Sequence, residues 1–482
     1  MLKIFSLIIL CLTASSPVLG ITPRNISFKE AIQTALSKNL DIKIAQLDEA
    51  LGKTYIDSAE SIFDPLFTSS IDWKDDQRKP PSIILGSKTI TRHYNFGLAK
   101  NTLLGTNFEL KYLNEFTDST SKFSSLNPSW EPKVALTITQ PLLNNFFGYI
   151  FRRELKQAEL KNQILKVQSK DTVEDLLKNI AYAYWELSAA QAILKIKKQA
   201  LEQAQKLYSA NRRKLKLGTI EKTDLLASEA NVRARENDIL SAQNVLENTA
   251  AKLKQALQHE TAQPLIAQDS LAFQEERFSA AKTLSRTFDQ KKEYLKAQKE
   301  LEQKNVILQM KKNARLPELD VVATITYNGL DTRYDPAFDD IKNFKNPTVM
   351  LGVQLSYPFG NHAAKRDVHQ SRIAKLTALY HFQKLQNDIR TDVTKKIHVL
   401  NTLKKQVHAV ETIQKLNEKK MIGEEEKFNR GRSSINFVIQ FQKEYLASSE
   451  SHIQALLDYE KAVIDLKRTE GTLLEHYLNP FL

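Results

Sequence analysis

The sequence has little proline, glycine or cysteine, and what it has is unevenly placed. Its 482 residues include 14 prolines and 13 glycines, yet residues 142–263 hold no proline and only two glycines, Gly148 and Gly218. Residues 359–479 also lack proline. Because proline and glycine interrupt helices, these two stretches predict helices longer than those of ordinary globular domains, turning at isolated glycines.

The single cysteine is Cys11, within an N-terminal segment that has the features of a secretory signal. Lys3 precedes the apolar run Ile4–Leu12, and Val18 and Gly20 stand three and one residues before Ile21. This pattern predicts a cleaved signal peptide, residues 1–20. The mature chain is then exported and has no disulfide bond.

Long apolar runs and catalytic motifs are also missing. No later window reaches the ~20 apolar residues of a transmembrane helix, so the mature chain is either soluble or crosses a membrane as strands. His259-Glu260 begins a zinc-protease pattern, but Gln263 stands where the second histidine must fall. Without a phosphate-binding glycine loop or a Cys/His cluster, we expect no enzyme, no cofactor and no metal.

The charge is strongly basic, with 69 Lys and Arg against 56 Asp and Glu and a net charge of +13. This charge could attract nucleic acid or an anionic surface. A secreted, mainly helical chain more simply distributes it over solvated helix faces. We therefore expect no nucleic acid partner.

The two proline-poor stretches belong to two similar halves. Pro141 precedes Gly218 by 77 positions, and Pro358 precedes Gly431 by 73. The predicted boundaries are residues 21–264 for the first repeat and residues 265–482 for the second.

Each half is predicted to contain a long antiparallel helical hairpin with its tip at Gly218 or Gly431. Apolar positions recur every seven residues on the returning arm, and small residues such as Ala242 and Thr249 fall between them. The recurring positions are Leu225, Val232, Ile239, Leu246 and Leu253 in the first half, and Val438, Tyr445, His452, Tyr459, Leu466 and Leu473 in the second. His452 is thus a residue of the helix seam rather than a ligand.

Shorter helices and strands precede each hairpin. Residues 28–61, with Ser27 as N-cap and Glu30 as its partner, and residues 278–314 are predicted helices. Apolar residues then alternate with small or polar ones, which predicts two strands in each half. The apolar sets are Phe67, Ile71 and Trp73; Val134, Leu136 and Ile138; Leu319, Val321, Ala323, Ile325 and Tyr327; and Val349, Leu351, Val353, Leu355 and Tyr357.

The first half has two more candidate strands, around residues 93–99 and 106–113. They could enlarge the sheet, extend it outward or fold into a lumen. The polar segments at residues 74–81, 114–132 and 328–347 read as surface loops.

One strand pair from each half gives four strands, too few to close a barrel. In lipid, each unpaired N–H or C=O group at an open edge costs several kcal/mol. Copies of the chain must therefore join around an axis, and their helices would form a tube.

The sequences ITQPLLNNFFG (residues 138–148), LSYPFGN (355–361) and LGTIEKTDLL (217–226), in this order and spacing, resemble the TolC-like outer membrane efflux protein family. The resemblance implies a mixed α/β membrane protein: a homotrimer with a shared twelve-stranded β-barrel in the outer membrane and a long periplasmic α-helical coiled-coil barrel. It also implies a periplasmic adaptor protein and an inner-membrane pump of RND, ABC or MFS type as partners, in efflux or type I secretion.

The same resemblance assigns roles to the two tips. Leu217-Gly218-Thr219 is similar to the family's adaptor-docking triplet, and Arg430-Gly431-Arg432 is its more basic counterpart. The implied entrance residues are Glu221, Thr223, Asp224, Phe428, Ser433, Phe437 and Gln440. Phe437 and Gln440 stand where the family often has acidic residues, Phe428 replaces a gating aromatic that bears a hydroxyl, and Ser433 replaces its basic partner. With basic residues crowded nearby, we expect an entrance less cation-selective than is usual for the family.

Three other interpretations remain. A periplasmic coiled-coil scaffold without a pore fits the heptads but not the strand pairs. A basic helical nucleic-acid binder fits the charge but not the signal peptide. A simple porin would consist of strands throughout.

Overall fold

The computed structural model describes residues 24–79, 84, 86–258 and 263–478, which form two compact units. The sheet unit comprises Ile44–Thr172 and Leu284–Thr391, and the helical unit comprises Val173–Thr283, Asp392–Leu482 and the segment up to Lys43. The predicted signal peptide and the His259-Glu260 pair lie outside the described residues. None of the described helices is long and apolar enough to cross a membrane.

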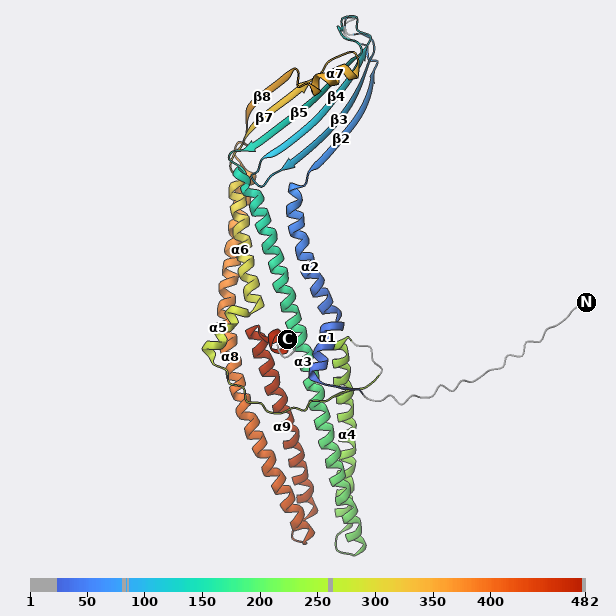
Figure 1. The fold of residues 1–482 in the computed structure, drawn as a ribbon. Coiled ribbons are helices and arrows are strands. Elements are labelled where there is room, and N and C mark those ends of the chain that lie inside the picture. The colour runs from blue at the N-terminus through green and yellow to red at the C-terminus, as the bar shows by residue number, and fades with distance from the viewer. Residues whose placement is uncertain (1–23, 80–83, 85, 259–262, 479–482) are drawn as a thin grey trace, which may run out of the picture. The chain divides into compact units, whose positions relative to one another are not determined.

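The sheet unit contains one antiparallel sheet of six strands, in the order β2-β3-β4-β5-β7-β8 (Figure 1). Its strands have 10–13 residues and are β2 (Leu66–Asp76), β3 (Thr89–Asn101), β4 (Asn107–Ser119), β5 (Ser129–Pro141), β7 (Glu318–Asn328) and β8 (Pro347–Ser356). β5 of the first half pairs with β7 of the second, so both halves share the sheet.

The sheet therefore has two strands more than the four that the strand pairs provide, and of the alternatives left open, the one in which the extra strands enlarge the sheet is observed. The two extra candidate strands are β3 and β4, and they lie in the middle of the sheet, between β2 and β5. β3 pairs with β2 from Thr89 to Ala99, and β4 pairs with β5 from Asn107 to Thr117. Three copies of this six-stranded sheet contain more strands than the twelve that the resemblance implies.

The three polar segments that the sequence predicts as surface loops are loops only in part. β2 extends to Asp76, β4 to Ser119 and β5 starts at Ser129, so strand residues occupy much of the predicted loops. The sequence did not predict these strand ends because polar side chains occupy one face of the sheet and make a strand end resemble a loop. In the third segment, α7 (Tyr334–Lys342) is a helix, and its Pro336 falls in the first turn, where proline is tolerated.

The sheet has one apolar face and one polar face. A single apolar rung crosses all six strands through cross-strand pairs, namely Phe67, Leu98, Leu110, Leu136, Ile325 and Val349. On the opposite face the equivalent rung is Thr68, Gly97, Lys111, Ala135, Thr326 and Thr348. α7 packs on the apolar face, where Tyr334 contacts Trp130 and its hydroxyl lies 3.0 Å from that of Tyr112.

One helical hairpin follows the strands of each half, and corresponding helices of the two hairpins have equal lengths. α3 (Tyr149–Lys216) and α8 (His362–Asn429) each have 68 residues. The returning helices α4 (Lys222–Leu257) and α9 (Ile435–Glu470) each have 36.

The helices that precede the strands are each divided in two, where the sequence predicted one. The first is α1 (Phe28–Lys38) and α2 (Leu40–Glu60). Ser27 caps α1 by accepting the Glu30 N–H, as predicted, whereas the Glu30 carboxylate pairs with Arg24. Asn39 interrupts them because its side chain accepts the Asp41 N–H at 2.8 Å and donates to the Ala256 carbonyl at 2.8 Å. The second divides at Lys291 into α5 (Ala280–Gln290) and α6 (Lys292–Asn313).

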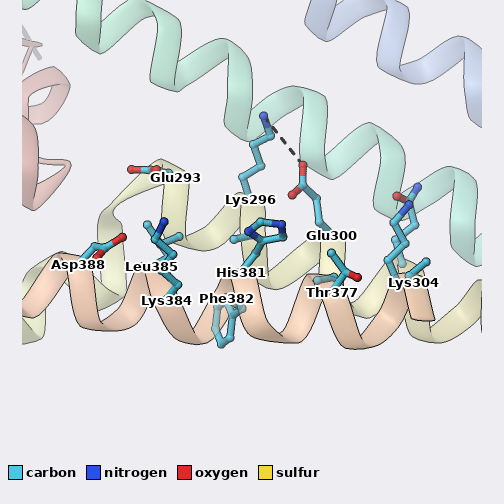
Figure 2. A pocket seen from close by; sticks show the side chains of 14 residues that line it. Glu293, Lys296, Glu300, Lys304, Thr377, His381, Phe382, Lys384, Leu385 and Asp388 are labelled. Carbon is cyan, nitrogen blue, oxygen red and sulfur yellow. Dashed lines mark ion pairs between the residues drawn. The ribbon is translucent and has the colours of Figure 1, made fainter. Parts of the chain in front are cut away.

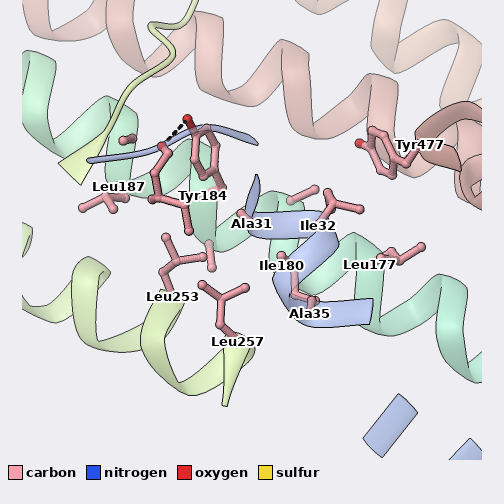
Figure 3. Close-up of a cluster of buried hydrophobic side chains, with 14 of the residues drawn as sticks. Ala31, Ile32, Ala35, Leu177, Ile180, Tyr184, Leu187, Leu253, Leu257 and Tyr477 are labelled. Carbon is pink, nitrogen blue, oxygen red and sulfur yellow. Dashed lines mark hydrogen bonds between the residues drawn. The ribbon is translucent and has the colours of Figure 1, made fainter. Parts of the chain in front are cut away.

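The main hydrophobic core lies in the helical unit, around Tyr184 of α3 (Figure 3). The first segments of the two halves meet there, as β1 (Arg24–Ile26) pairs in parallel with β6 (Leu265–Ala267). The Tyr184 hydroxyl lies 2.7 Å from an Asp269 carboxylate oxygen, which also accepts the Phe28 N–H at 2.7 Å. α10 (Leu473–Leu478) adds Leu473 and Tyr477 to this core.

Candidate functional site: the two hairpin tips

The first tip connects α3 to α4 through a left-handed glycine. Gly218 has φ +67°, its N–H donates to the Leu215 carbonyl at 2.9 Å, and the Thr219 N–H donates to Lys214 at 3.0 Å. This pair of bonds is the Schellman arrangement that ends many helices. No atom lies within 4 Å of the position of a Cβ on Gly218, so only its backbone conformation favours glycine.

The second tip, between α8 and α9, repeats the same geometry. Gly431 has φ +74°, its N–H donates to the Phe428 carbonyl at 3.0 Å, and the Arg432 N–H donates to Lys427 at 2.8 Å. Space around Gly431 is again open. The isolated glycines of the sequence thus mark the turns of both hairpins, as predicted.

Glu221 and Asp224 start the returning helix α4. They form a capping box, in which each side chain accepts an N–H of the other residue, and the Glu221 N–H to Asp224 carboxylate distance is 3.4 Å. Thr223 lies between them and is exposed. Three of the predicted entrance residues are therefore neighbours at one helix start.

The two tips are connected to each other through Phe428. Its ring is buried with Ile435 and Val438 of α9, and Leu207 of α3 packs against this cluster. The Lys214 ammonium lies 4.0 Å from the centre of the Phe428 ring and 3.5 Å from its carbonyl oxygen. A cation–π contact thus links the two tips. At this position the resemblance implied an aromatic side chain that forms a hydrogen bond through its hydroxyl.

Ser433 is held by a carboxylate of its own hairpin. Its hydroxyl donates to Glu424 at 2.5 Å, and Lys427 pairs with the same carboxyl group at 3.2 Å. The Ser433 hydroxyl, and after it Lys427, lowers the pKa of Glu424, so this group is anionic at neutral pH. Glu424 is therefore part of the second tip, although it was not among the predicted entrance residues.

The remaining predicted residues are on the surface. Leu217, Gly218, Thr219, Arg430, Gly431 and Arg432 are exposed, as are Phe437 and Gln440 on α9. Leu217 is 77% exposed and Phe437 is 53% exposed, although both are large and apolar. Gln440 donates to Glu444 at 2.9 Å. These exposed residues remain available to a partner or to solvent.

Sequence reasoning missed the roles of Lys214 and Glu424. Lys214 was one of several basic residues near the tip, and nothing in its local sequence distinguishes it from Lys216. Its ring partner is more than 200 residues away along the chain, so a single sequence carries no signal of the contact.

Away from the tips, an open groove lies between α6 and α8 in the sheet unit (Figure 2). It has a volume of about 820 Å³ and a mixed lining. Lys296 and Glu300 form an ion pair at 4.0 Å, with His381 and Phe382 on the facing helix. Among the residues the structure describes, no cluster of His, Cys, Asp or Glu side chains could hold a metal ion, in this groove or elsewhere.

Comparison with solved structures places the fold among outer membrane channels. The chain aligns with the CmeC outer membrane channel of Campylobacter jejuni with a TM-score of 0.67 and 15% identity, covering 92% of this chain and 85% of that one. The outer membrane protein VceC of Vibrio cholerae aligns with a TM-score of 0.67 and 11% identity, covering 92% of this chain and 96% of that one. The MtrE outer membrane channel of Neisseria gonorrhoeae, in its open state, aligns with a TM-score of 0.66 and 13% identity, covering 92% of this chain and 88% of that one.

Part of the sequence matches a family of the same description. The family model described as "Outer membrane efflux protein" matches residues 109–259, from β4 through the first hairpin. Residues 109–259 thus resemble outer membrane efflux proteins in sequence, and the predicted resemblance to the TolC-like family is confirmed. No curated protein sequence matches the chain.

Proposed function

We propose that this protein is an outer membrane channel that carries small molecules or proteins from periplasmic transport machinery to the exterior. The observation that carries the proposal is the six-stranded sheet, with one apolar and one polar face, on the same chain as two long helical hairpins. Lipid solvates an apolar face, whereas water in a pore solvates a polar face. The domain match to outer membrane efflux proteins supports this assignment.

Closure of the channel requires further copies of the chain. Among the described residues, β2 and β8 each pair with only one strand, so each leaves a row of unpaired backbone groups. These groups need partners inside a bilayer. We propose that three copies join edge to edge into one barrel, and that their helical hairpins together line a tunnel in the periplasm.

The tips form the periplasmic entrance in this proposal. The exposed triplets Leu217-Gly218-Thr219 and Arg430-Gly431-Arg432 would dock a periplasmic adaptor, which connects the channel to an RND, ABC or MFS pump. Glu221, Thr223, Asp224, Phe428, Ser433, Phe437 and Gln440 would border the opening. The Lys214–Phe428 contact supports a closed resting state because it ties one hairpin to the other.

The proposal is tested by membrane fractionation and reconstitution. The protein should require detergent for extraction, migrate as a trimer on electrophoresis without heating and as a 55.0 kDa chain, or slightly less after signal cleavage, when boiled. In planar bilayers it should form discrete conductance steps. A monomer without conductance would contradict the proposal.

The alternative function, a periplasmic scaffold without a pore, gives the opposite result in the same fractionation. A scaffold would wash off membranes in high salt or carbonate. The 43% to 76% exposure of the apolar residues Val349, Leu351, Val353, Leu355 and Tyr357 favours the channel, because such a stripe is costly in water.

A further inference from the structure

The central hairpin β3–β4 changes the size of the pore that this chain can build. Three copies of a six-stranded sheet provide eighteen strands. We infer, on the basis of the proposed channel function, that the assembled protein is an eighteen-stranded barrel in which β3 and β4 span the membrane, and that β2 of each copy pairs with β8 of the next copy.

The pairing of β3 and β4 makes them full members of the sheet. β3 pairs with β4 over all 13 residues, from Thr89–Ser119 to Asn101–Asn107, without a bulge in the register. β2 has no backbone pairing with β5, because β3 and β4 separate them. Removing the hairpin from the barrel would therefore require breaking two complete strand interfaces.

The side chains of the hairpin alternate in phase with those of the other strands. Its apolar side presents Tyr94, Phe96 and Leu98 on β3 and Phe108, Leu110 and Tyr112 on β4. The polar side presents Thr91, His93 and Asn95 on β3, and Glu109, Lys111 and Glu115 on β4. Leu98 is 47% exposed and Leu110 is 46% exposed, so the described residues leave about half of each side chain uncovered on the apolar face. The alternation is that of strands with lipid on one side and a water-filled lumen on the other.

Rings suited to a membrane interface occur near one end of the strands. Trp73, Arg92, Phe116 and Trp130 form one rung across β2 to β5, and the Arg92 guanidinium lies 5.1 Å from the centre of the Phe116 ring. Aromatic girdles at this position are typical of outer-membrane barrels. β3 and β4 contribute two of the four members of this rung.

At the other end, the β3–β4 turn is built into the connection between β5 and α3. Gly105 and Gly148 both have positive φ, and a Cβ on Gly148 would overlap the Leu103 carbonyl oxygen. The Thr106 hydroxyl donates to the Gln140 side chain at 2.5 Å. The glycine of the sequence QPLLNNFFG is thus required by the hairpin itself.

The strand directions allow closure. In an antiparallel sheet of six strands the first and last run in opposite directions, so β2 of one copy meets β8 of the next in antiparallel orientation. Barrel diameter grows roughly linearly with strand number, so eighteen strands give about 1.5 times the diameter of twelve. Barrels of this size leave an aqueous channel, so the sheet region would pass bulky cargo, and the narrowest point would lie at the helix tips.

Single cysteines test the inference, because Cys11 is the only native cysteine and lies in the predicted signal peptide. Leu110→Cys and Lys111→Cys report on opposite faces of β4, and Ile325→Cys and Thr326→Cys are the matched controls on β7. Each unheated trimer is reconstituted in vesicles. A bimane on the cysteine is quenched with nitroxide-labelled phospholipid, and access from water is measured with a membrane-impermeant maleimide.

We expect lipid quenching at positions 110 and 325, with maleimide modification at 111 and 326 at least ten times faster than at 110 and 325. If β7 alternates but both β4 positions are water-exposed and unquenched, the hairpin lies outside the bilayer and the eighteen-stranded barrel is wrong, while the channel stands. If neither strand alternates in a folded trimer, the channel function itself is contradicted.

Discussion

At the scale of single residues, the helical unit depends on a few buried polar contacts between distant helices. Arg468 of α9 lies 3.2 Å from Glu174 and 2.7 Å from Asp175 of α3. The Glu174 side chain is completely buried, so its charge is stabilised by protein groups rather than by water.

We predict that Arg468→Met destabilises the protein by about 3–5 kcal/mol, because it removes a cationic partner from a buried carboxylate. Lys178→Ala is the matched control, since the Lys178–Asp465 pair at 2.7 Å is partly exposed and should contribute less than about 1 kcal/mol. Chemical denaturation in detergent compares the two. Equal effects would show that the Arg468 pair is not specially important.

Glycines provide a second prediction at this scale, since Gly148 and Gly218 both have positive φ but different surroundings. An added methyl group on Gly218 meets only the backbone penalty, about 1–2 kcal/mol, whereas one on Gly148 also overlaps the Leu103 backbone. We expect Gly218→Ala to assemble normally and Gly148→Ala to yield little trimer. The yield of unheated trimer in outer membranes measures this, and equal yields would refute it.

At the scale of elements, the α8–α9 seam contains a histidine with a perturbed pKa. His452 Nδ1 lies 2.7 Å from the Gln414 side-chain oxygen, with Glu411 and Lys415 of α8 nearby. Burial lowers the pKa of His452 below its ordinary value of 6.5, although the Glu411 carboxylate partly opposes this.

His452 therefore binds a proton more tightly in the unfolded chain than in the folded chain. The free energy of unfolding is unaffected by protonation of His452 above pH 6.5 and decreases as the pH falls below this value. We predict that acidification from pH 7.5 to 5.5 destabilises the wild type more than His452→Gln. Thermal denaturation at both pH values measures the difference. An identical pH dependence for both proteins would contradict the prediction.

The two hairpin tips form the other element with a testable contact. Lys214→Ala removes the cation–π contact with Phe428, which contributes about 0.5–2 kcal/mol. We expect the variant to open more often in planar bilayers, by roughly twofold to thirtyfold at equilibrium. Lys216→Ala is the control, because Lys216 is exposed at the same helix end. Equal opening of both variants would exclude a role for the contact.

At the scale of the whole molecule, the distribution of charge would decide how ions enter the proposed channel. The chain has a net charge of +13, and the tips carry basic residues, with Phe437 and Gln440 exposed on α9. A neutral or basic entrance attracts cations less than an acidic one.

We therefore predict a weak ion preference, with a reversal potential close to zero in a potassium chloride gradient. The double variant Phe437→Glu and Gln440→Glu adds six carboxylates to a trimer. It should shift the reversal potential toward the value expected for a cation-selective channel. Strong cation preference in the wild type would overturn this expectation.

Local patterns predicted much of the molecule. The tip turns at Gly218 and Gly431, the Ser27 cap and the alternating strands each depend on residues close in sequence, whose backbone preferences act wherever the segment lies. The resemblance to outer membrane efflux proteins followed from the order of such short segments.

Pairing between distant segments decided the rest. Whether β3 and β4 join the sheet depends on hydrogen bonds to β2 and β5, and their composition alone fits three different locations. The break at Asn39 depends on the Ala256 carbonyl, and the role of Lys214 depends on the Phe428 ring, each more than 200 residues away. Such contacts are determined by packing and by the need to pair buried polar groups, which act only once the chain has folded.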